Sequence, residues 1–150
     1  MKVEIQRINR EKEEQVLIRC YEINQEVSEI ARFVKSRQEG IEVYNEESVR
    51  IVPLFDIYYV EAVDNHVFAY LKNQVYEVKL RLYEIEQLYG EKQFFRCSKT
   101  TIVNLMKIQA LKPALNGRFT AMLTNGESVI ISRKFVPDLK VKLQGGQTNE

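Results

Sequence analysis

Apolar and polar residues alternate through most of the chain between residues 41 and 132, and this pattern predicts a mostly-β domain. A strand with one buried face directs every second side chain into the core, so alternation over about four to eight residues is typical of such strands. The expected strands are IEVYN (41–45), SVRIVPLF (48–55), IYYVEAV (57–63), HVFAYL (66–71), VYEVKL (75–80), ALKPAL (110–115), RFTAML (118–123) and ESVIIS (127–132). Pro53 marks an edge or a bulge, because proline cannot donate a hydrogen bond to a sheet ladder.

Turn signals separate these runs and predict antiparallel hairpins. Asp64-Asn65 stands between two alternating runs, and Asn-Gly pairs stand at 116–117 and 125–126. Asparagine and glycine tolerate the left-handed backbone conformation that tight hairpins require. Two Asn-Gly pairs between alternating runs are among the strongest hairpin signals that a single sequence offers.

Residues 1–40 are expected to form a separate, small β-β-α unit. Short alternating runs at 3–8 and 16–21 predict its two strands. Asn24 suits the N-cap of the helix that follows, and Gly40 suits its end. The apolar face of this helix would consist of Val27, Ile30, Ala31 and Val34. Such a unit is a candidate dimerisation or regulatory element.

Two further helices are expected in the rest of the chain. Residues 80–90 (LRLYEIEQLYG) have helical periodicity, with Leu82, Ile85 and Leu88 facing the core and Gly90 at the end. A short helix is expected to begin near Pro137, and residues 145–150 are expected to be a disordered tail. The expected fold class is therefore mostly β (α+β), with a few short helices.

The formal net charge of +1 conceals a strong asymmetry along the chain. Residues 1–91 carry 12 Lys or Arg against 18 Asp or Glu, whereas residues 92–150 carry 10 against 3. Such a skew indicates a basic surface that could receive a polyanion. Charge compensation between two faces of one molecule would leave the same pattern, so charge alone does not decide between the two.

The sequence lacks the residue sets that catalysis or cofactor binding would need. His66 is the single histidine, and Cys20 and Cys97 are the two cysteines, so neither a metal site nor a disulfide framework is expected. No phosphate-binding glycine motif and no nucleophile motif occurs. The N-terminus lacks the apolar core of a signal peptide, and no apolar run approaches the roughly 18 residues of a membrane span. We therefore expect a cytoplasmic protein that is not an enzyme and binds no cofactor.

Polar and basic residues gather at three places where a strand gives way to a loop. These clusters are Asp64-Asn65-His66, Ser98-Lys99-Thr100 and Ser132-Arg133-Lys134. Loops that are held by a rigid sheet commonly carry recognition groups. Cations and hydroxyls bind phosphate oxygens, and Arg, Lys and His side chains can reach base edges, so the clusters are candidate DNA contacts.

Each cluster also has a purely structural interpretation. His66 could be an ordinary turn residue, Lys99 a solvated surface lysine, and Ser132 the cap of a terminal helix. Two other function classes stay open as well. One is a protein-interaction module that binds a partner through residues 1–40, and the other is a small-ligand sensor without DNA binding.

Residues 94–108 (FFRCSKTTIVNLMKI) resemble the central motif of the LytTR DNA-binding domain, a pattern of the form F-x-R-x-H-R-S-x-(aliphatic)-V-N-x-x-x-I. The I-Y-Y-V-E-A hairpin, the helix ending in L-Y-G and the closing N-G-E-x-(aliphatic)-x-(aliphatic)-S-R-K run also stand in the family's order. The resemblance covers about residues 43–143 and places the domain at 41–144. Ser98 stands where the family has a histidine, so base preference at that position does not carry over. Lys99 keeps the basic position, and Thr100 replaces the usual serine.

The resemblance implies an elongated fold of small, stacked antiparallel sheets with few short helices. It also implies sequence-specific binding to double-stranded DNA through loops that enter successive major grooves, with contacts from His66, from Lys99, and from Arg133 and Lys134. Residues 1–40 are too short for the receiver domain of typical members, so a stand-alone bacterial transcription regulator is expected. It would bind tandem half-sites as a homodimer, because linking two binding units raises affinity through effective concentration.

Overall fold

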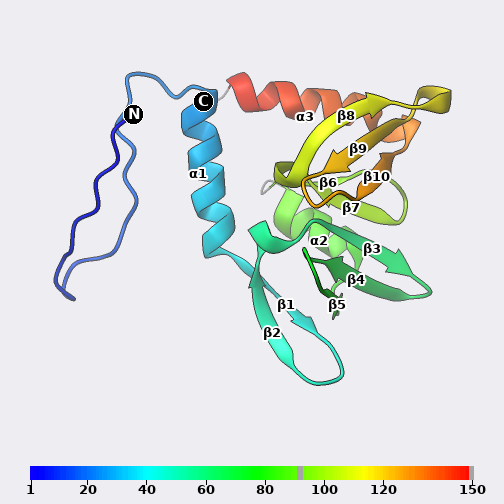
Figure 1. Ribbon diagram of the computed structural model, residues 1–150, viewed down its shortest axis with the longest axis horizontal. Coiled ribbons are helices and arrows are strands. Elements are labelled where there is room, and N and C mark those ends of the chain that lie inside the picture. The colour runs from blue at the N-terminus through cyan, green and yellow to red at the C-terminus, as the bar shows by residue number, and fades with distance from the viewer. Residues whose placement is uncertain (91–92, 149–150) are drawn as a thin grey trace.

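The structure is a computed structural model that describes residues 1–90 and 93–148. Within these residues, two antiparallel sheets form the body of the molecule (Figure 1). The larger sheet has the strand order β2-β1-β5-β4-β3-β7-β6, and the smaller has the order β10-β9-β8. The strands are β1 (Gly40–Tyr44), β2 (Val49–Pro53), β3 (Tyr59–Val63), β4 (His66–Tyr70), β5 (Val75–Val78), β6 (Phe94–Arg96), β7 (Thr101–Asn104), β8 (Ile108–Pro113), β9 (Phe119–Leu123) and β10 (Ser128–Ile131). The predicted mostly-β fold is confirmed, since every alternating run beyond residue 40 contains a strand.

The turns follow the sequence signals. Asp64 and Asn65 both have positive φ, 49° and 68°, so the β3–β4 hairpin closes with two left-handed residues, as a tight hairpin does. Asn116 and Gly117 close the β8–β9 hairpin in the same way, with φ of 61° and 76°. At the second Asn-Gly pair only Gly126 has positive φ, and the β9–β10 turn, like the β8–β9 turn, is one residue longer than the β3–β4 turn.

The strands β6 and β7 lie between two hydrophobic cores. Ile102 belongs to the core shared with α2 (Leu82–Tyr89), whereas its neighbour Val103 belongs to the core shared with the smaller sheet. Phe94 and Phe95 divide between the two cores in the same way. Because successive side chains of a strand point to opposite faces, a strand covered on both sides is apolar throughout. This explains the continuous apolar stretches of the central segment.

A buried asparagine ends β7. Asn104 is 1% exposed, its Nδ2 donates to the Ile57 carbonyl at 2.9 Å, and its Oδ1 accepts from the Met106 backbone N–H at 3.0 Å. The second bond caps the short 3-10 helix η3 (Leu105–Lys107). The asparagine of the V-N motif is therefore a structural clamp between β7 and the segment before β3.

Of the three residues of α2 expected to face the core, one differs in the structure. Leu82 and Ile85 are buried as predicted, but Leu88 is 57% exposed, so its predicted core position is wrong. Tyr89 packs against the core instead. A spacing of seven residues returns to nearly the same helix face, whereas a spacing of six does not, at about 100° per residue. The helix ends at Gly90, as expected.

The predicted helix of the N-terminal unit is confirmed as α1 (Gln25–Gln38). The Asn24 side chain caps it by accepting from the Val27 N–H at 3.0 Å. Gly40 is the first residue of β1 and Glu39 is the C-cap, so the helix ends one residue earlier than expected. α1 lies beside the 3-10 helix η1 (Leu54–Asp56), where Phe33 meets Phe55 edge to face at 4.8 Å between ring centroids. Figure 1 shows α1 standing at one side of the sheets.

The two strands predicted at 3–8 and 16–21 are wrong as features of the single chain. Residues 1–24 contain no strand or helix, and nearly all of them are exposed. The segment leaves the body, turns near Asn9–Lys12 and runs back to α1 (Figure 1). A two-stranded hairpin on its own is marginal in water, which accounts for a strand pattern without a strand ladder.

The C-terminal helix α3 (Val136–Thr148) is longer than expected. It begins next to Pro137 as predicted, but residues 145–148 continue the helix, so the expectation of a disordered tail is wrong for them; residues 149–150 lie outside the described residues. Val136 and Leu139 anchor the helix in the core below the smaller sheet. None of the helices in the described part of the chain has the length and apolar composition needed to cross a bilayer.

Candidate nucleic-acid interface

Backbone contacts connect the ends of several strands along one edge of the molecule. The Ala62 N–H of β3 donates to the Thr100 carbonyl at 2.8 Å, which joins the β3–β4 hairpin to the β6–β7 loop. The Ser132 N–H donates to the Cys97 carbonyl at 2.8 Å, which joins that loop to the end of β10. Figure 1 shows the β3–β4, β6–β7 and β8–β9 turns pointing to the same side. The three clusters singled out in the sequence are thus neighbours in space.

The first cluster surrounds the β3–β4 turn. Asn65 is exposed in the turn itself, and His66 opens β4 with 58% of its side chain exposed. The Nδ1 atom of His66 lies 2.6 Å from Oε2 of Glu77, and this hydrogen bond lowers the pKa of Glu77. The bond fixes the imidazole ring and leaves its Nε2 atom for an external partner.

The second cluster is a compact loop between β6 and β7. The Ser98 hydroxyl accepts from the Thr100 N–H at 3.2 Å and lies 3.5 Å from the Thr100 hydroxyl. These contacts fold the loop around Lys99, whose exposed side chain has no hydrogen bond or ion pair within the described residues. Lys99 is therefore presented at the tip, and Ser98 and Thr100 shape the backbone beneath it.

Arg96 holds this loop in place, a role that sequence reasoning missed. Its guanidinium donates to the Ser98 carbonyl at 2.7 Å, to the Lys99 carbonyl at 2.5 Å and to the Glu86 carboxylate at 2.9 Å. The planar guanidinium carries several donors in fixed directions, which suits it to bind carbonyls and a carboxylate together. The signal was present, since arginine is a fixed position of the motif, but the partners depend on the tertiary fold.

Buried groups anchor the base of the same loop. Cys97 is fully buried, and burial raises the pKa of its thiol to about 12, so the sulfur stays protonated and unreactive. Its Sγ lies 3.4 Å from the Thr101 carbonyl, and Thr101 is itself buried. The loop thus rises directly from the core, which restricts its movement.

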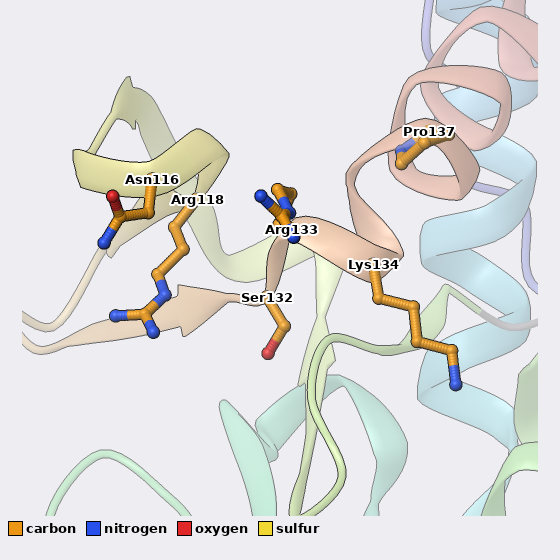
Figure 2. Close-up of a pocket in the computed structure, with 6 residues that line it drawn as sticks. All are labelled: Asn116, Arg118, Ser132, Arg133, Lys134 and Pro137. Carbon is orange, nitrogen blue, oxygen red and sulfur yellow. The ribbon is translucent and has the colours of Figure 1, made fainter.

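The third cluster lines an open hollow of about 550 Å³ at the end of β10 (Figure 2). Arg133 and Lys134 belong to the 3-10 helix η5 (Arg133–Phe135), which leads directly into α3. Ser132 occupies the N-cap position of η5, but its side chain makes no capping hydrogen bond. The residues lining the hollow are Asn116, Arg118, Ser132, Arg133, Lys134 and Pro137. Figure 2 shows Ser132 between Arg118 on one side and Lys134 on the other.

Asn116 and Arg118, on either side of Gly117 in the first Asn-Gly turn, were not predicted as site residues from the sequence. The β8–β9 turn approaches Arg133 so closely that a Cβ atom built on Gly117 would lie 2.8 Å from its Cδ and 2.9 Å from its Cγ. Glycine at this position therefore meets two demands, a φ of +76° and space for the arginine stem. The contact brings Arg118 and Arg133 to the same hollow.

The edge carries cations without intramolecular counter-charges. Lys99, Arg118, Arg133 and Lys134 are all exposed, and none forms an ion pair within the described residues. Lys134 makes a loose cation–π contact with Phe135 at 5.7 Å. We call this row of loops and cations, from residues 64–66 through 98–100 to 116–118 and 132–134, the loop edge. Its positive charge reflects the cation excess in the C-terminal part of the chain.

Comparison with known proteins identifies the domain. The family model of the LytTr DNA-binding domain matches residues 47–144. A solved structure, described as the LytTr DNA-binding domain of a response regulator from Bacillus cereus, superposes with a TM-score of 0.66 at 26% identity, covering 69% of this chain and 95% of that domain.

Similar proteins are named as sensory transduction or transcriptional regulatory proteins. The chain is 31% identical over 122 residues to the sensory transduction protein LytT of Enterococcus faecalis and 28% identical over 127 residues to the transcriptional regulatory protein YpdB of Escherichia coli K12. The matched residues make up 81% and 84% of this chain but only 50% and 52% of the two relatives. This chain therefore spans about half of the relatives' length. An HTH-type transcriptional regulator of Staphylococcus aureus MRSA252 is 31% identical over 100 residues, with 67% of each chain covered. This chain therefore belongs to the LytTR DNA-binding domain family.

Proposed function

We propose that this protein is a cytoplasmic transcription regulator that binds specific sites in double-stranded DNA through the loop edge. The observation that carries the proposal is the row of neighbouring loops whose exposed cations form no ion pair within the described residues. Counterion release at phosphates supplies much of the affinity of such a surface for DNA. The names of its relatives as transcriptional regulators support the same function.

The side chains of the loops fall into two groups, those suited to contact phosphates and position the protein, and those suited to read base edges. Lys99, at the tip of a rigid loop, and Arg133 are suited to donate to guanine O6 and N7 in a major groove. The Nε2 atom of His66 is suited to a base edge, with its ring fixed by Glu77. Lys134 and Arg118 border the hollow and are suited to phosphate, and the Ser98 and Thr100 hydroxyls to the backbone near Lys99. Since the loops follow one another along the edge, we infer that they enter successive major grooves.

The departure from the family motif concerns specificity. Ser98 replaces an imidazole by a short hydroxyl that is engaged with Thr100 inside the loop. A hydroxyl can donate to phosphate or to either base type, so it discriminates less than a bidentate group. We infer that base reading at the central loop passes mainly to Lys99.

Two copies on tandem half-sites fit this mode of binding. Joining two DNA-binding units makes the second binding event intramolecular, which can raise affinity by about 10²–10⁴-fold without new contacts. We therefore infer that the functional form is a homodimer whose half-site spacing follows the DNA helical repeat.

Selection of binding sites from random duplexes tests the function. The full chain should enrich a motif, and the logarithm of its binding constant for that motif should fall linearly with the logarithm of the salt concentration, by about 0.9 per phosphate contact. A pool without enrichment, or weak binding that salt does not change, would contradict the proposal and favour the protein-interaction or ligand-sensor alternatives.

Gly117→Ala should weaken duplex binding by about three- to tenfold, because the new Cβ displaces the stem of Arg133 from the hollow. The positive φ also makes alanine strained here, at a cost of about 1 kcal/mol of stability. Gly126→Ala is the matched control, since Gly126 has φ of +90° but nothing within 4 Å of an added Cβ. Titration of both variants with the selected duplex should show the loss in Gly117→Ala alone. Equal affinities would mean that the position of Arg133 does not matter for binding.

A further inference from the structure

The N-terminal segment has the register of a β-hairpin although it forms no ladder. The Lys12 N–H donates to the Asn9 carbonyl at 3.2 Å, which makes residues 9–12 a β-turn. A hairpin with Arg10 and Glu11 as its two loop residues would pair residue 8 with 13, 5 with 16 and 3 with 18, although neither loop residue has the positive φ of the favoured two-residue turns. Met1, Arg19 and Cys20 line one open hollow, together with residues that lead into α1, so the far ends of the two arms lie near each other as this register requires.

This register separates the side chains into two unlike faces. Because paired residues of a hairpin share a face, one side would carry Met1, Val3, Ile5, Val16, Ile18 and Cys20, with Arg7 opposite Glu14 at its end. The other side would carry Lys2, Glu4, Gln6, Ile8, Glu13, Gln15, Leu17 and Arg19. We call the first set the apolar ribbon face. The second set is polar except for Ile8 and Leu17, so the segment is amphipathic in this register and in no register shifted by one residue.

Most of the apolar ribbon face is uncovered in the described chain, and among its apolar side chains only Ile18 is half-buried. Met1 is 71% exposed, Val3 82%, Ile5 93% and Val16 63%. Apart from the turn, no backbone hydrogen bond of residues 1–8 or 13–21 occurs within the described residues. The two arms have a strand pattern, a closing turn and an uncovered apolar face. A stable sheet additionally requires further strands or a second layer packed on that face.

We propose that this face is covered by the same face of a second copy of the chain. The face carries one cation and one anion, Arg7 and Glu14, which would lie opposite each other, so it has no surplus charge that would select an acidic or basic partner. Residues 1–24 as a whole carry five Lys or Arg and five Asp or Glu. An isologous pairing needs one surface that complements itself, and a neutral apolar ribbon with an internal ion pair meets this condition.

This interface would hold together the homodimer proposed above. The pairing itself does not depend on DNA binding, and only its biological role rests on the proposed function. Two ribbons would bury their apolar faces together and form ladders that one ribbon alone does not form. The arm stands away from the loop edge in the fold, so dimerisation through it would leave both DNA-binding edges free (Figure 1). Helix α1 (Gln25–Gln38) of each copy would then connect the paired ribbons to that copy's DNA-binding domain.

Sedimentation equilibrium of the full chain without DNA tests the interface. The wild type should be a dimer, and hydrogen exchange should show protected amides at residues 2–8 and 13–20. Ile5→Lys should raise the dimer dissociation constant by more than about 100-fold, because a lysine on the buried face has no free counter-charge. It should also abolish the protection.

Leu17→Lys is the matched control. Leu17 is 70% exposed and almost as apolar as Ile5, but it lies on the other side of the ribbon, so this variant should remain a dimer. A wild type that is monomeric at every accessible concentration would overturn the proposal, as would a dimer that survives Ile5→Lys or dissociates equally in Leu17→Lys.

Duplex binding separates this proposal from the proposed function. Ile5→Lys should bind a single half-site as the wild type does and lose about 10²–10⁴-fold on a tandem site. A dimer that binds no duplex would contradict the DNA-binding proposal and leave the ribbon interface standing. A monomer that binds single half-sites would contradict the ribbon interface and leave the DNA-binding proposal standing.

Discussion

Replacing Lys99 and Arg133 together by alanine is expected to weaken specific duplex binding by about 2–6 kcal/mol. Each residue, if it reads a base, contributes about 1–3 kcal/mol. The two side chains are exposed in different loops, and neither has an intramolecular partner within the described residues, so their effects should be nearly additive. The fold should be unaffected, because exposed substitutions of this kind usually change stability by less than about 0.5 kcal/mol.

Titrations with the selected duplex at several salt concentrations check this expectation. A base-reading residue should lower affinity most on the preferred sequence, whereas a residue that contacts only phosphate should lower it on all sequences and reduce the salt slope by about 1. Lys35→Ala with Lys72→Ala is the control, since it removes the same charge from exposed positions outside the loop edge. Comparable losses in both double variants would show that only total charge matters.

Asn104→Ala is expected to lower the free energy of unfolding by about 2–4 kcal/mol. The substitution removes both side-chain hydrogen bonds of the clamp and leaves the Ile57 carbonyl and the Met106 N–H without these partners. A buried polar group that loses its partner costs about 1–3 kcal/mol. For a chain of this size, this should lower the midpoint of thermal unfolding by about 5–15 °C.

Calorimetric or circular-dichroism melting measures this loss. Asn73→Ala is a suitable control, since Asn73 is exposed and its side chain makes no hydrogen bond within the described residues. Because Asn104 lies in the core and not on the loop edge, the variant should retain duplex affinity at temperatures where it is folded. An unchanged melting temperature would mean that the clamp contributes nothing to stability, contrary to this interpretation of the motif.

Eight of the ten strands in the described part of the chain could be predicted because their signals are local, whereas β6 and β7 were not predicted, since both their faces are covered and their sequences do not alternate. Alternation identifies one buried face per strand, and Asp64-Asn65 and Asn116-Gly117 supply the two left-handed residues of tight turns. The same reasoning failed at Leu88, where the angular spacing along the helix turns Tyr89 instead of Leu88 toward the core. It also failed at residues 145–148, which were expected to belong to a disordered tail but continue α3.

The candidate site was only partly predictable, for a different reason. Lys99, Arg133 and Lys134 could be picked out because they stand at strand ends. Arg96 and Arg118 could not, because their roles come from contacts between segments far apart in the sequence, such as Arg96 with Glu86. The strands predicted at 3–8 and 16–21 are wrong because a two-stranded hairpin alone is marginal in water, and alternation in a sequence does not show whether further strands will lie beside it.

Lysine footprinting on the bound duplex tests the central claim most directly. The full chain is treated with an amine-reactive reagent, with and without the selected duplex, and the modified lysines are counted by mass spectrometry. Lys72 is an internal reference, because it is exposed in the β4–β5 turn, at the end of β4 away from His66. If the loop edge lies against DNA, Lys99 and Lys134 lose their reactivity and Lys72 keeps it. If Lys99 and Lys134 stay reactive at saturating DNA, or Lys72 is protected as strongly as they are, the duplex does not bind at the loop edge.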